Sequence, residues 1–393
     1  MNRRFIYLLF FYFLPISLFS QVKVGAEQTE LYFPFLKGKR IAVCANQTSM
    51  VGEVHLIDTL IATEIDVVKI FSPEHGFRGD AEAGALINSS RDRKTGIEIV
   101  SLYGKNKKPT QEQMQNIDLL IFDIQDVGCR FYTYISTLHY LMEAAAESQI
   151  PLLILDRPNP NGYYVAGPVL KSQFTSFVGM HPIPIIHGMT IAEYAQMING
   201  EKWLKNKDTC QLYFVLVDNY THQTRYSLPI PPSPNLQTDE AINLYPSLCL
   251  FEGTVISVGR GTSTPFQIYG APELKAGEFY FTPKSIKGVA ENPPHLEKKC
   301  RGENLTAIAD SNLSLLKNDF TLSYLIQAYQ NYPDKSLFFN RPNFFDKLMG
   351  NSTVRQMILD GKNQKEIEAS WQDELEEFEL LRKKYLLYND SSE

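Results

Sequence analysis

Apolar residues follow two alternating patterns along most of this chain. Short apolar runs predict strands, and these runs cover residues 40–46, 66–72, 97–104, 118–128, 151–162 and 210–220. Apolar residues at intervals of three and four predict helices between the strands, over residues 55–63, 133–149 and 189–200. We predict one further strand over 182–188. We also predict a short helix that starts at Thr110, because Thr110 and Gln113 match a capping box.

Strand and helix patterns that alternate in this way favour an α/β fold. We predict a Rossmann-like, doubly wound parallel sheet with helices on both of its faces. The consecutive apolar residues of 118–128 are typical of a central strand in such a sheet. The alternation stops near the proline-rich segment 229–238, which is either a linker or a rigid cleft wall. We therefore predict a Rossmann-like domain over 21–238 and a smaller α+β domain over 239–393, with an amphipathic helix over 365–388.

The first 20 residues have the pattern of a secretory signal peptide. Arg3 and Arg4 precede an apolar stretch over 5–19, and Ser20 is a small residue suited to cleavage. We exclude this segment from the fold and predict a secreted, periplasmic protein, with an N-terminal membrane anchor as the alternative. No later segment is long and apolar enough to predict a membrane span, so we expect no integral membrane segment after cleavage.

The composition narrows the class of protein. The 393 residues carry a formal net charge of −6 with both signs interspersed, which argues against a nucleic-acid-binding protein. The five cysteines are widely spaced without a CxxC motif, so neither a zinc knuckle nor a redox pair is predicted, and one disulfide stays open. Glycine-rich phosphate-binding motifs are absent, and we predict no cofactor. Aromatic residues make up 12 %, and aromatic faces are common in carbohydrate clefts as well as in cores.

The second predicted strand ends in a cluster of titratable groups, KIFSPEHGFRGD, at residues 69–80. Ligands of doubly wound sheets bind beyond the carboxyl ends of the strands. A carboxyl group beside apolar walls holds its proton more readily and can act as a general acid, so we predict this role for Glu74. His75 is predicted to orient Glu74, to share its proton or to bind the substrate, with a histidine bound by a backbone carbonyl as the alternative. Arg78 is predicted to bind substrate. The alternative is a surface ion pair between Glu74 and Arg78.

The segment FDIQDVGCRFYTY, residues 122–134, follows the central strand and carries the next group of candidates. Asp123 or Asp126 is predicted to supply a second carboxylate, and Gln125 to bind a sugar hydroxyl or amide. Arg130 pairs either with an anionic ligand or with Asp126. The alternative for the segment is that it caps the following helix.

Further strand ends and glycine-rich turns supply candidate substrate-binding residues. These are Asn46, Tyr134, Asp156, Arg157, His187, Asn235, Glu252 and Arg260. Arg260 stands among glycines and can hold a carboxylate in a bidentate fork; the alternative is a solvated arginine in a hairpin. Asp156 and Arg157 can equally pair with each other. No HExxH or HxH spacing occurs, so we predict no metal, with a site built from His75, Asp123, Asp126 and His187 as the alternative.

Taken together, these motifs resemble the exo-β-N-acetylmuramidases of peptidoglycan turnover, glycoside hydrolase family 171, formerly a domain of unknown function. The matching segments are SPEHGFRG (72–79), SLYG (101–104), FDIQDVGCRFYTY (122–134), LDRPNP (155–160), HGMTIAEYA (187–195), PPSPN (231–235), YPSLCLFEGT (245–254) and SVGRGTSTPFQIYGAP (257–272). The chain departs from the family where tryptophans usually precede PPSPN, and Tyr220 and Tyr226 are expected to replace them as stacking surfaces.

The resemblance implies that 21–238 is the catalytic domain and that 239–393 closes a cleft between the two domains, with Glu74 as the catalytic residue. It implies release of N-acetylmuramic acid from the non-reducing end of peptidoglycan fragments, so that the partners are disaccharides and muropeptides. Such cleavage needs a proton donor and a second group, Asp123 or Asp126 or the substrate's own 2-acetamido group, and retention or inversion stays open. The lactyl carboxylate of muramic acid calls for an arginine, for which Arg260 and Arg130 are the candidates. The alternatives are a muropeptide-binding protein without activity and a metal-dependent amidase or esterase, and the oligomeric state is not predicted.

Overall fold

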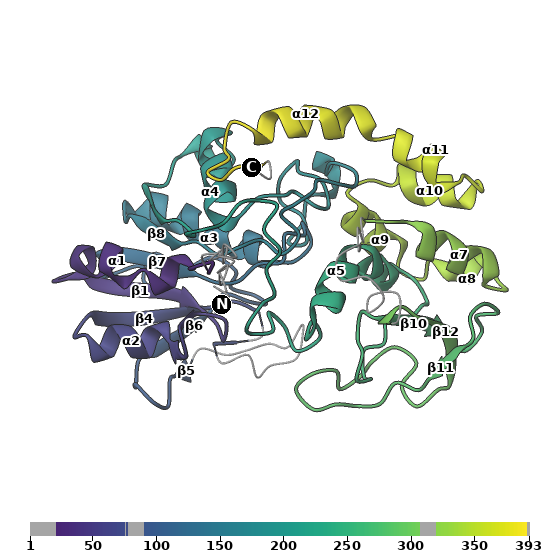
Figure 1. Ribbon diagram of the computed structural model, residues 1–393, viewed down its shortest axis with the longest axis horizontal. Coiled ribbons are helices and arrows are strands. Elements are labelled where there is room, and N and C mark those ends of the chain that lie inside the picture. The colour runs from purple at the N-terminus through teal and green to yellow at the C-terminus, as the bar shows by residue number, and fades with distance from the viewer. Residues whose placement is uncertain (1–20, 75, 78–89, 307–319, 391–393) are drawn as a thin grey trace, which may run out of the picture.

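The computed structural model describes residues 21–74, 76–77, 90–306 and 320–390 (Figure 1). Within them, a seven-stranded sheet has the order β5-β6-β4-β1-β7-β8-β9. Its strands are β1 (Arg40–Ala45), β4 (Asp66–Ser72), β5 (Ser90–Arg91), β6 (Glu98–Ser101), β7 (Leu119–Asp123), β8 (Leu152–Leu155) and β9 (Leu212–Val215). All neighbours pair in parallel except β5, which is antiparallel to β6. Counted along the chain, the parallel strands have the order 3-2-1-4-5-6, which is the Rossmann order. The predicted fold class is confirmed.

Helices cover both faces of the sheet because successive strand residues point to opposite sides. Leu120 and Phe122 of β7 belong to a core shared with α3 (Tyr134–Ser148) and α4 (Ile191–Gly200). Leu119 and Ile121 belong to a second core with α1 (Thr29–Leu36) and α2 (Leu56–Ala62). All five residues of β7 are buried, as predicted for a central strand.

Two predicted elements of this part are wrong. The capping box of Thr110 and Gln113 forms, with Thr110 N donating to Gln113 Oε1 at 2.9 Å and Gln113 N to Thr110 Oγ1 at 3.2 Å. Residues 111–116 nevertheless form turns, and Asn116 has a φ of 61°. One capped turn is too short to propagate as a helix. Residues 182–188 make only isolated bridges, at Ile186, because Pro182 and Pro184 have no N–H to donate to a ladder.

The second part of the chain combines a small sheet with helices, as predicted. The strands β10 (Ile268–Ala271), β12 (Cys300–Asn304) and β11 (Phe279–Phe281) pair antiparallel in that order. The helices are α5 (Asp239–Leu248), α7 (Ser323–Asn331), α8 (Lys335–Phe338), α9 (Pro342–Met349), α10 (Thr353–Leu359), α11 (Gln364–Ala369) and α12 (Gln372–Arg382). The single helix predicted over 365–388 is therefore two helices, because Trp371 leaves the helical region with a φ of −124°.

Smaller elements complete the described chain. They are the hairpin β2 (Met50–Val51) and β3 (Val54–His55), and the 3₁₀ turns Gly25–Glu27, Ser172–Phe174, Lys205–Lys207 and Cys249–Gly253. All five cysteines are buried and free, so the disulfide left open does not form. Among the described residues, no helix has the length and apolar character needed to cross a membrane.

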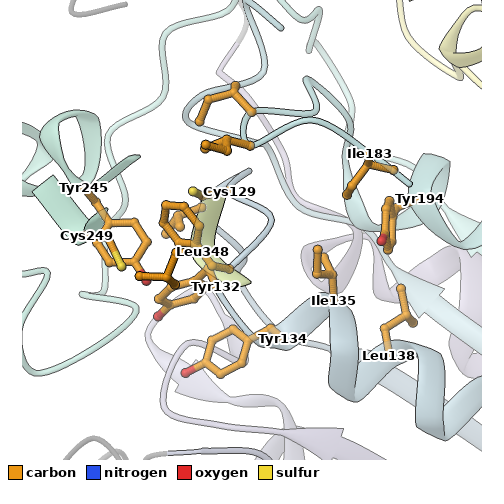
Figure 2. Close-up of a cluster of buried hydrophobic side chains, with 14 of the residues drawn as sticks. Cys129, Tyr132, Tyr134, Ile135, Leu138, Ile183, Tyr194, Tyr245, Cys249 and Leu348 are labelled. Atoms are coloured by element: carbon orange, nitrogen blue, oxygen red, sulfur yellow. The ribbon is translucent and has the colours of Figure 1, made fainter. Parts of the chain in front are cut away.

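The two parts share one hydrophobic core, which fixes the wall between them. Tyr132, just before α3, lies beside Tyr245, Cys249 and Leu348 of the second part (Figure 2). The ring centroids of Tyr132 and Tyr245 are 5.8 Å apart. Figure 1 shows that the chain returns after α12 toward α4. There, Tyr388 donates to Asp156 Oδ2 at 2.6 Å. The boundary predicted at residues 238 and 239 stays a prediction.

A buried ion pair lies at the carboxyl end of β7. Arg157 Nε and Nη2 donate to Asp123 Oδ1 and Oδ2 at 2.6 and 3.0 Å, and Arg157 Nη2 also reaches the carbonyl of Met50 at 3.2 Å. The Asp123 side chain has no exposed surface and that of Arg157 is 6 % exposed. The pair therefore joins the end of β7 to β2 and to the loop that follows β8.

We expect Arg157→Met to lower the free energy of unfolding by about 3–5 kcal/mol, because it leaves the buried carboxylate of Asp123 without a partner. Urea unfolding at pH 7 measures the loss. The matched control is Arg40→Met, which removes an exposed pair with Asp118 and should cost less than about 1 kcal/mol. Equal losses in the two variants would contradict the structural role of Asp123 and Arg157.

Candidate active site

A cavity of about 740 Å³ lies between the sheet and the second part of the chain. On one side it is lined by residues that follow strands β4, β6 and β7: Glu74, Tyr103 and residues 131–134. On the other side it is lined by residues of the second part, among them Glu252, Arg260 and Arg341. The cavity therefore lies where a doubly wound sheet binds its ligands, and its volume is typical of a small-molecule site.

Glu74 is positioned by a tight turn after β4. Gly76 has a φ of 79° and its N–H donates to the carbonyl of Pro73 at 3.2 Å, so the chain reverses directly beside Glu74. Glu74 is half-buried in the cavity wall. The turn thus holds a carboxyl group at the end of a buried strand, as the sequence predicts.

Two hydroxyl groups orient this carboxyl group. Thr133 Oγ1 donates to Glu74 Oε2 at 3.0 Å. Burial raises the pKa of Tyr103, and the charge of Glu74 and a hydrogen bond to it raise that pKa further, so the phenol keeps its proton. Thr133 is the N-cap residue of α3 but makes no side-chain capping bond. Its hydroxyl group therefore binds Glu74 in the cavity wall and does not cap the helix.

Aromatic rings make up much of the cavity surface. They belong to Tyr103, Phe131, Tyr132, Tyr134, Phe177, Tyr245, Phe251, Phe266 and Phe344. Tyr132 and Tyr134 donate to the carbonyl of Pro232 at 2.9 and 3.1 Å. The segment 229–238 connects the two parts of the chain, and its Ser233 and Leu236 also line the cavity, so both interpretations of this segment apply.

A second carboxylate on the wall is already neutralised. Arg260 Nε and Nη2 donate to Glu252 Oε1 at 3.1 and 2.7 Å. Burial opposes the charge of Arg260, but Glu252 outweighs it and raises the pKa of the guanidinium. The flanking Gly259 and Gly261 have φ values of 76° and 82°, which allow the loop to turn on both sides of Arg260.

The cavity gathers some of the predicted site residues and not others. Those that line it are Glu74, Tyr134, Glu252 and Arg260. Those that do not are Asn46, Asp123, Gln125, Asp126, Arg130, Asp156, Arg157, His187 and Asn235. His75 and Arg78 lie outside the described residues. Tyr220 and Tyr226 do not line the cavity either. The roles predicted for all of these residues stay predictions.

The polar groups after β7 are engaged within the protein. Besides the pair of Asp123 with Arg157, Gly128 N donates to Asp126 Oδ2 at 2.7 Å. Gln125 Nε2 donates to the carbonyls of Asp126 and Pro158 at 2.8 and 2.7 Å. These bonds shape the loop that leads to Thr133.

Arg130 is the largest fully buried side chain of the described residues. Its Nη1 donates to the carbonyls of Pro168 and Ile183, both at 2.7 Å, and its Nη2 to that of Leu348 at 2.8 Å. Burial lowers its pKa to about 10. Arg130 therefore ties α9 to the first part of the chain, and this position does not expose it to a ligand's carboxylate.

The remaining candidates anchor loops and the end of the chain. Asp156 accepts from Ala192 N at 3.0 Å and from Tyr388. Met189 N donates to His187 Nδ1 at 3.2 Å, and burial lowers the pKa of His187 to about 3. Asn46 Oδ1 accepts from the N–H and hydroxyl of Thr48 at 2.9 and 2.6 Å, and Asn235 Nδ2 donates to the carbonyl of Val289 at 3.1 Å. Asn46 and His187 thus stabilise their own loops, while Asp156 and Asn235 bind segments that are distant in the sequence.

Most lining residues were not among the predicted site residues, and three of them have a part in the site's chemistry: Tyr103, Thr133 and Arg341. Tyr103 follows β6 within SLYG, so its place after a parallel strand was a usable signal. Thr133 precedes α3 and reads as an ordinary N-cap. Arg341 follows a segment without periodicity and gives no signal in the sequence. The described part of the chain also contains no group of three His, Cys, Asp or Glu side chains placed to hold a metal ion.

An aromatic cavity with a hydroxyl-bound glutamate, placed at the carboxyl end of a Rossmann-like sheet, defines a carbohydrate-active α/β protein. Family models describe it more closely: that of the N-terminal part of the exo-beta-N-acetylmuramidase NamZ matches residues 41–240, and that of the C-terminal part matches residues 243–388. The chain belongs to this family.

Known proteins agree with this assignment. The chain is 41 % identical over 372 residues to the peptidoglycan beta-N-acetylmuramidase NamZ of Bacillus subtilis (strain 168), a match that covers 90 % of this chain and 88 % of that protein. Two crystal structures of DUF1343 family proteins from Bacteroides fragilis NCTC 9343 are similar to it. One is 52 % identical with a TM-score of 0.87, and covers 95 % of this chain and 100 % of its own. The other is 28 % identical with a TM-score of 0.76, and the match covers 94 % of this chain and 99 % of that protein's chain.

The buried carboxyl group of Asp126 predicts a pH dependence of stability. Burial raises its pKa to about 7, although the N–H groups of Gly128 and Val127 lower it. An unfolded Asp titrates near pH ~3.9. Between about pH 4 and 7 the native state therefore binds the additional proton, and stability from this group falls as the pH rises.

We expect Asp126→Asn to flatten this fall and to stabilise the protein at pH 8, on the order of 2–4 kcal/mol, since each pKa unit corresponds to about 1.4 kcal/mol. Urea unfolding at several values between pH 5 and 8 measures the difference. Asp118→Asn is the control, because the Arg40 hydrogen bonds lower the pKa of that exposed carboxyl to about 2 and its removal should give no gain. Parallel pH profiles for the wild type and Asp126→Asn would show that Asp126 is ionised without cost.

Proposed function

We propose that this protein is an exo-acting glycoside hydrolase that releases N-acetylmuramic acid from the non-reducing end of peptidoglycan fragments. Membership of the NamZ family supports the reaction. The observation that carries the mechanism is the position of Glu74, which lines the cavity and is bound by Thr133. The substrates are peptidoglycan-derived disaccharides and muropeptides.

Glu74 acts as the general acid in this proposal. It transfers its proton to the glycosidic oxygen as the bond from that oxygen to C1 breaks, so that the next sugar leaves as a neutral alcohol. Thr133 and Tyr103 hold the carboxyl group in one orientation, which is what proton transfer in a transition state requires. A half-buried site also strengthens the interaction between the acid and the reacting oxygen.

The same step also needs a group that stabilises C1 as the bond breaks. Asp123 and Asp126 do not line the cavity, and Glu252 is bound by Arg260. The proposal therefore gives this role to the substrate's own 2-acetamido oxygen, as in substrate-assisted glycosidases. That oxygen bonds to C1 as the leaving group departs. Glu74 then takes a proton from the water that opens the cyclic intermediate, so the acid is restored.

Attack at the chain end follows from the wall that the second part supplies. Phe266, Arg260 and Glu252 line the side of the cavity opposite the sheet, and the shared core fixes this side in place. In the proposal, this side blocks the glycan beyond its terminal sugar, so that the rest of the glycan extends outward. We also propose that the protein is secreted to the periplasm, on the pattern of residues 1–20, and that the mature chain starts at Gln21, which its N-terminal sequence would test.

We expect Glu74→Gln to lower the rate of N-acetylmuramic acid release at least ~10²-fold, because an amide cannot donate the proton. The substrate is the disaccharide of N-acetylmuramic acid and N-acetylglucosamine, and chromatography measures the free sugars. Binding of the disaccharide should persist, since the amide keeps the shape of the side chain. The control is Glu112→Gln, an exposed glutamate in the turn 111–116.

Two outcomes would contradict the proposal. A wild-type protein that binds the disaccharide without releasing sugar is a binding protein. One that releases peptides or acyl groups, and stops when a chelator is added, is a metal-dependent amidase or esterase. Full activity of Glu74→Gln would contradict the role of Glu74 as the general acid, but not the proposed reaction.

A further inference from the structure

The charged side chains that line the cavity differ in the partners they have within the protein. Those that line it are Glu74, Glu252, Arg260, His295 and Arg341. Glu252 and Arg260 form an ion pair, and His295 Nε2 hydrogen-bonds the carbonyl of Val255 at 2.6 Å. Glu74 lies on the side of the sheet and accepts from Thr133 Oγ1 at 3.0 Å. Arg341 lies on the side of the second part.

Arg341 is oriented without being neutralised. Its guanidinium lies 4.3 Å from the centroid of the Phe344 ring, and its Nη1 donates to the carbonyl of Glu252 at 3.4 Å. Its own N–H donates to the carbonyl of Gly253 at 3.2 Å. No described carboxylate lies within ion-pair distance of it, and the residue is exposed. A ring and a carbonyl therefore steer the positive group, while its charge stays available.

The backbone around Arg341 adds to the positive potential. Arg341 is the N-cap residue of α9, and the first turn of this helix contains no acidic residue. The N-terminal end of a helix carries a partial positive charge that favours anions. The Arg341 guanidinium and the start of α9 therefore favour the same kind of ligand, an anion.

The substrate of the proposed function carries one anionic group that distinguishes it from other amino sugars. N-acetylmuramic acid is N-acetylglucosamine with a lactyl ether on O3, and the lactyl group ends in a carboxylate. The planar guanidinium of arginine binds a carboxylate through two parallel N–H···O bonds. Of the two arginines predicted for this role, Arg130 is buried among carbonyls and Arg260 already has a carboxylate partner.

We infer that Arg341 binds the lactyl carboxylate of N-acetylmuramic acid and makes the cavity select this sugar. The inference rests on the proposed function, which it deepens by naming the residue that recognises the substrate. Arg341 is a specificity residue in this scheme and takes no part in proton transfer. The carbonyl of Glu252 and the ring of Phe344 position Arg341, while the Glu252 carboxylate stays paired with Arg260.

The experiment compares two substrates that differ only in the charge of the lactyl group. They are the disaccharide with a free lactyl carboxylate and its lactyl methyl ester. For the wild type, we expect kcat/KM to be about 10- to 100-fold higher for the free acid, which is the range of a hydrogen bond to a charged group. Arg341→Gln should lose this preference, so that its acid and ester rates agree within about 2-fold, while its rate on the ester stays near that of the wild type.

Two further variants sharpen the comparison. Arg341→Lys keeps the charge but not the fork and should retain part of the preference. Arg93→Gln removes an exposed arginine that does not line the cavity and should change neither rate. Thermal unfolding of each variant shows that the fold is kept, which is expected because the side chain of Arg341 is exposed.

Failure of the inference and failure of the proposed function are separable. If Arg341→Gln keeps the preference for the acid, or if Arg260→Gln alone loses it, Arg341 is not the recognition residue although the enzyme is a muramidase. If the wild type releases no sugar from either substrate, the reaction is wrong. In that case, binding of free N-acetylmuramic acid and its methyl ester to the wild type and Arg341→Gln, measured by calorimetry, still decides the role of Arg341: an equal preference in both proteins overturns it.

Discussion

The apolar contact between the start of α3 and the second part of the chain is the interaction on which the site depends. The cavity has one wall on each part, so its shape exists only while the parts are held together. Phe131 and Tyr132 pack against Tyr245, with centroid distances of 5.5 and 5.8 Å. The neighbouring residue Thr133 binds Glu74. The same short segment thus joins the two walls and orients the carboxyl group, so a change that loosens the contact would also release Glu74.

Polar groups beneath this contact keep the loops in one arrangement. The loops after parallel strands are buried here, and buried polar groups must find partners within the protein. Asp123, Asp156 and Arg130 do so through Arg157, the tail of the chain and three carbonyls. Most of the charged residues that the sequence offers as catalytic candidates therefore stabilise the loops at the carboxyl ends of the strands.

This burial explains what the sequence could and could not predict. The strands and the long helices follow from the periods of apolar residues, because burial of strand faces and helix faces imposes those periods. The position of Glu74 follows from the rule that parallel strands deliver ligand-binding residues at their carboxyl ends. Whether a strand-end residue reaches the cavity depends on its partner, and Arg157 lies 34 residues from Asp123. No local sequence pattern encodes such a pairing. For the same reason, no local pattern predicts the position of Arg341, whose neighbour Glu252 is 89 residues away.

The path of the chain adds a second constraint on the cavity. The chain leaves the first part through the segment 229–238, which Tyr132 and Tyr134 hold by the carbonyl of Pro232. It returns after α12, where Glu193 Oε1 accepts from Leu387 N at 2.8 Å. A hinge motion needs connections that can change conformation. Here, both connections between the parts are hydrogen-bonded to the first part, and the surface between the parts is apolar. The geometry thus favours walls that are set before the substrate arrives. The proposed general acid and the proposed carboxylate-binding arginine lie on opposite walls. Fixed walls therefore keep the distance between these two side chains constant.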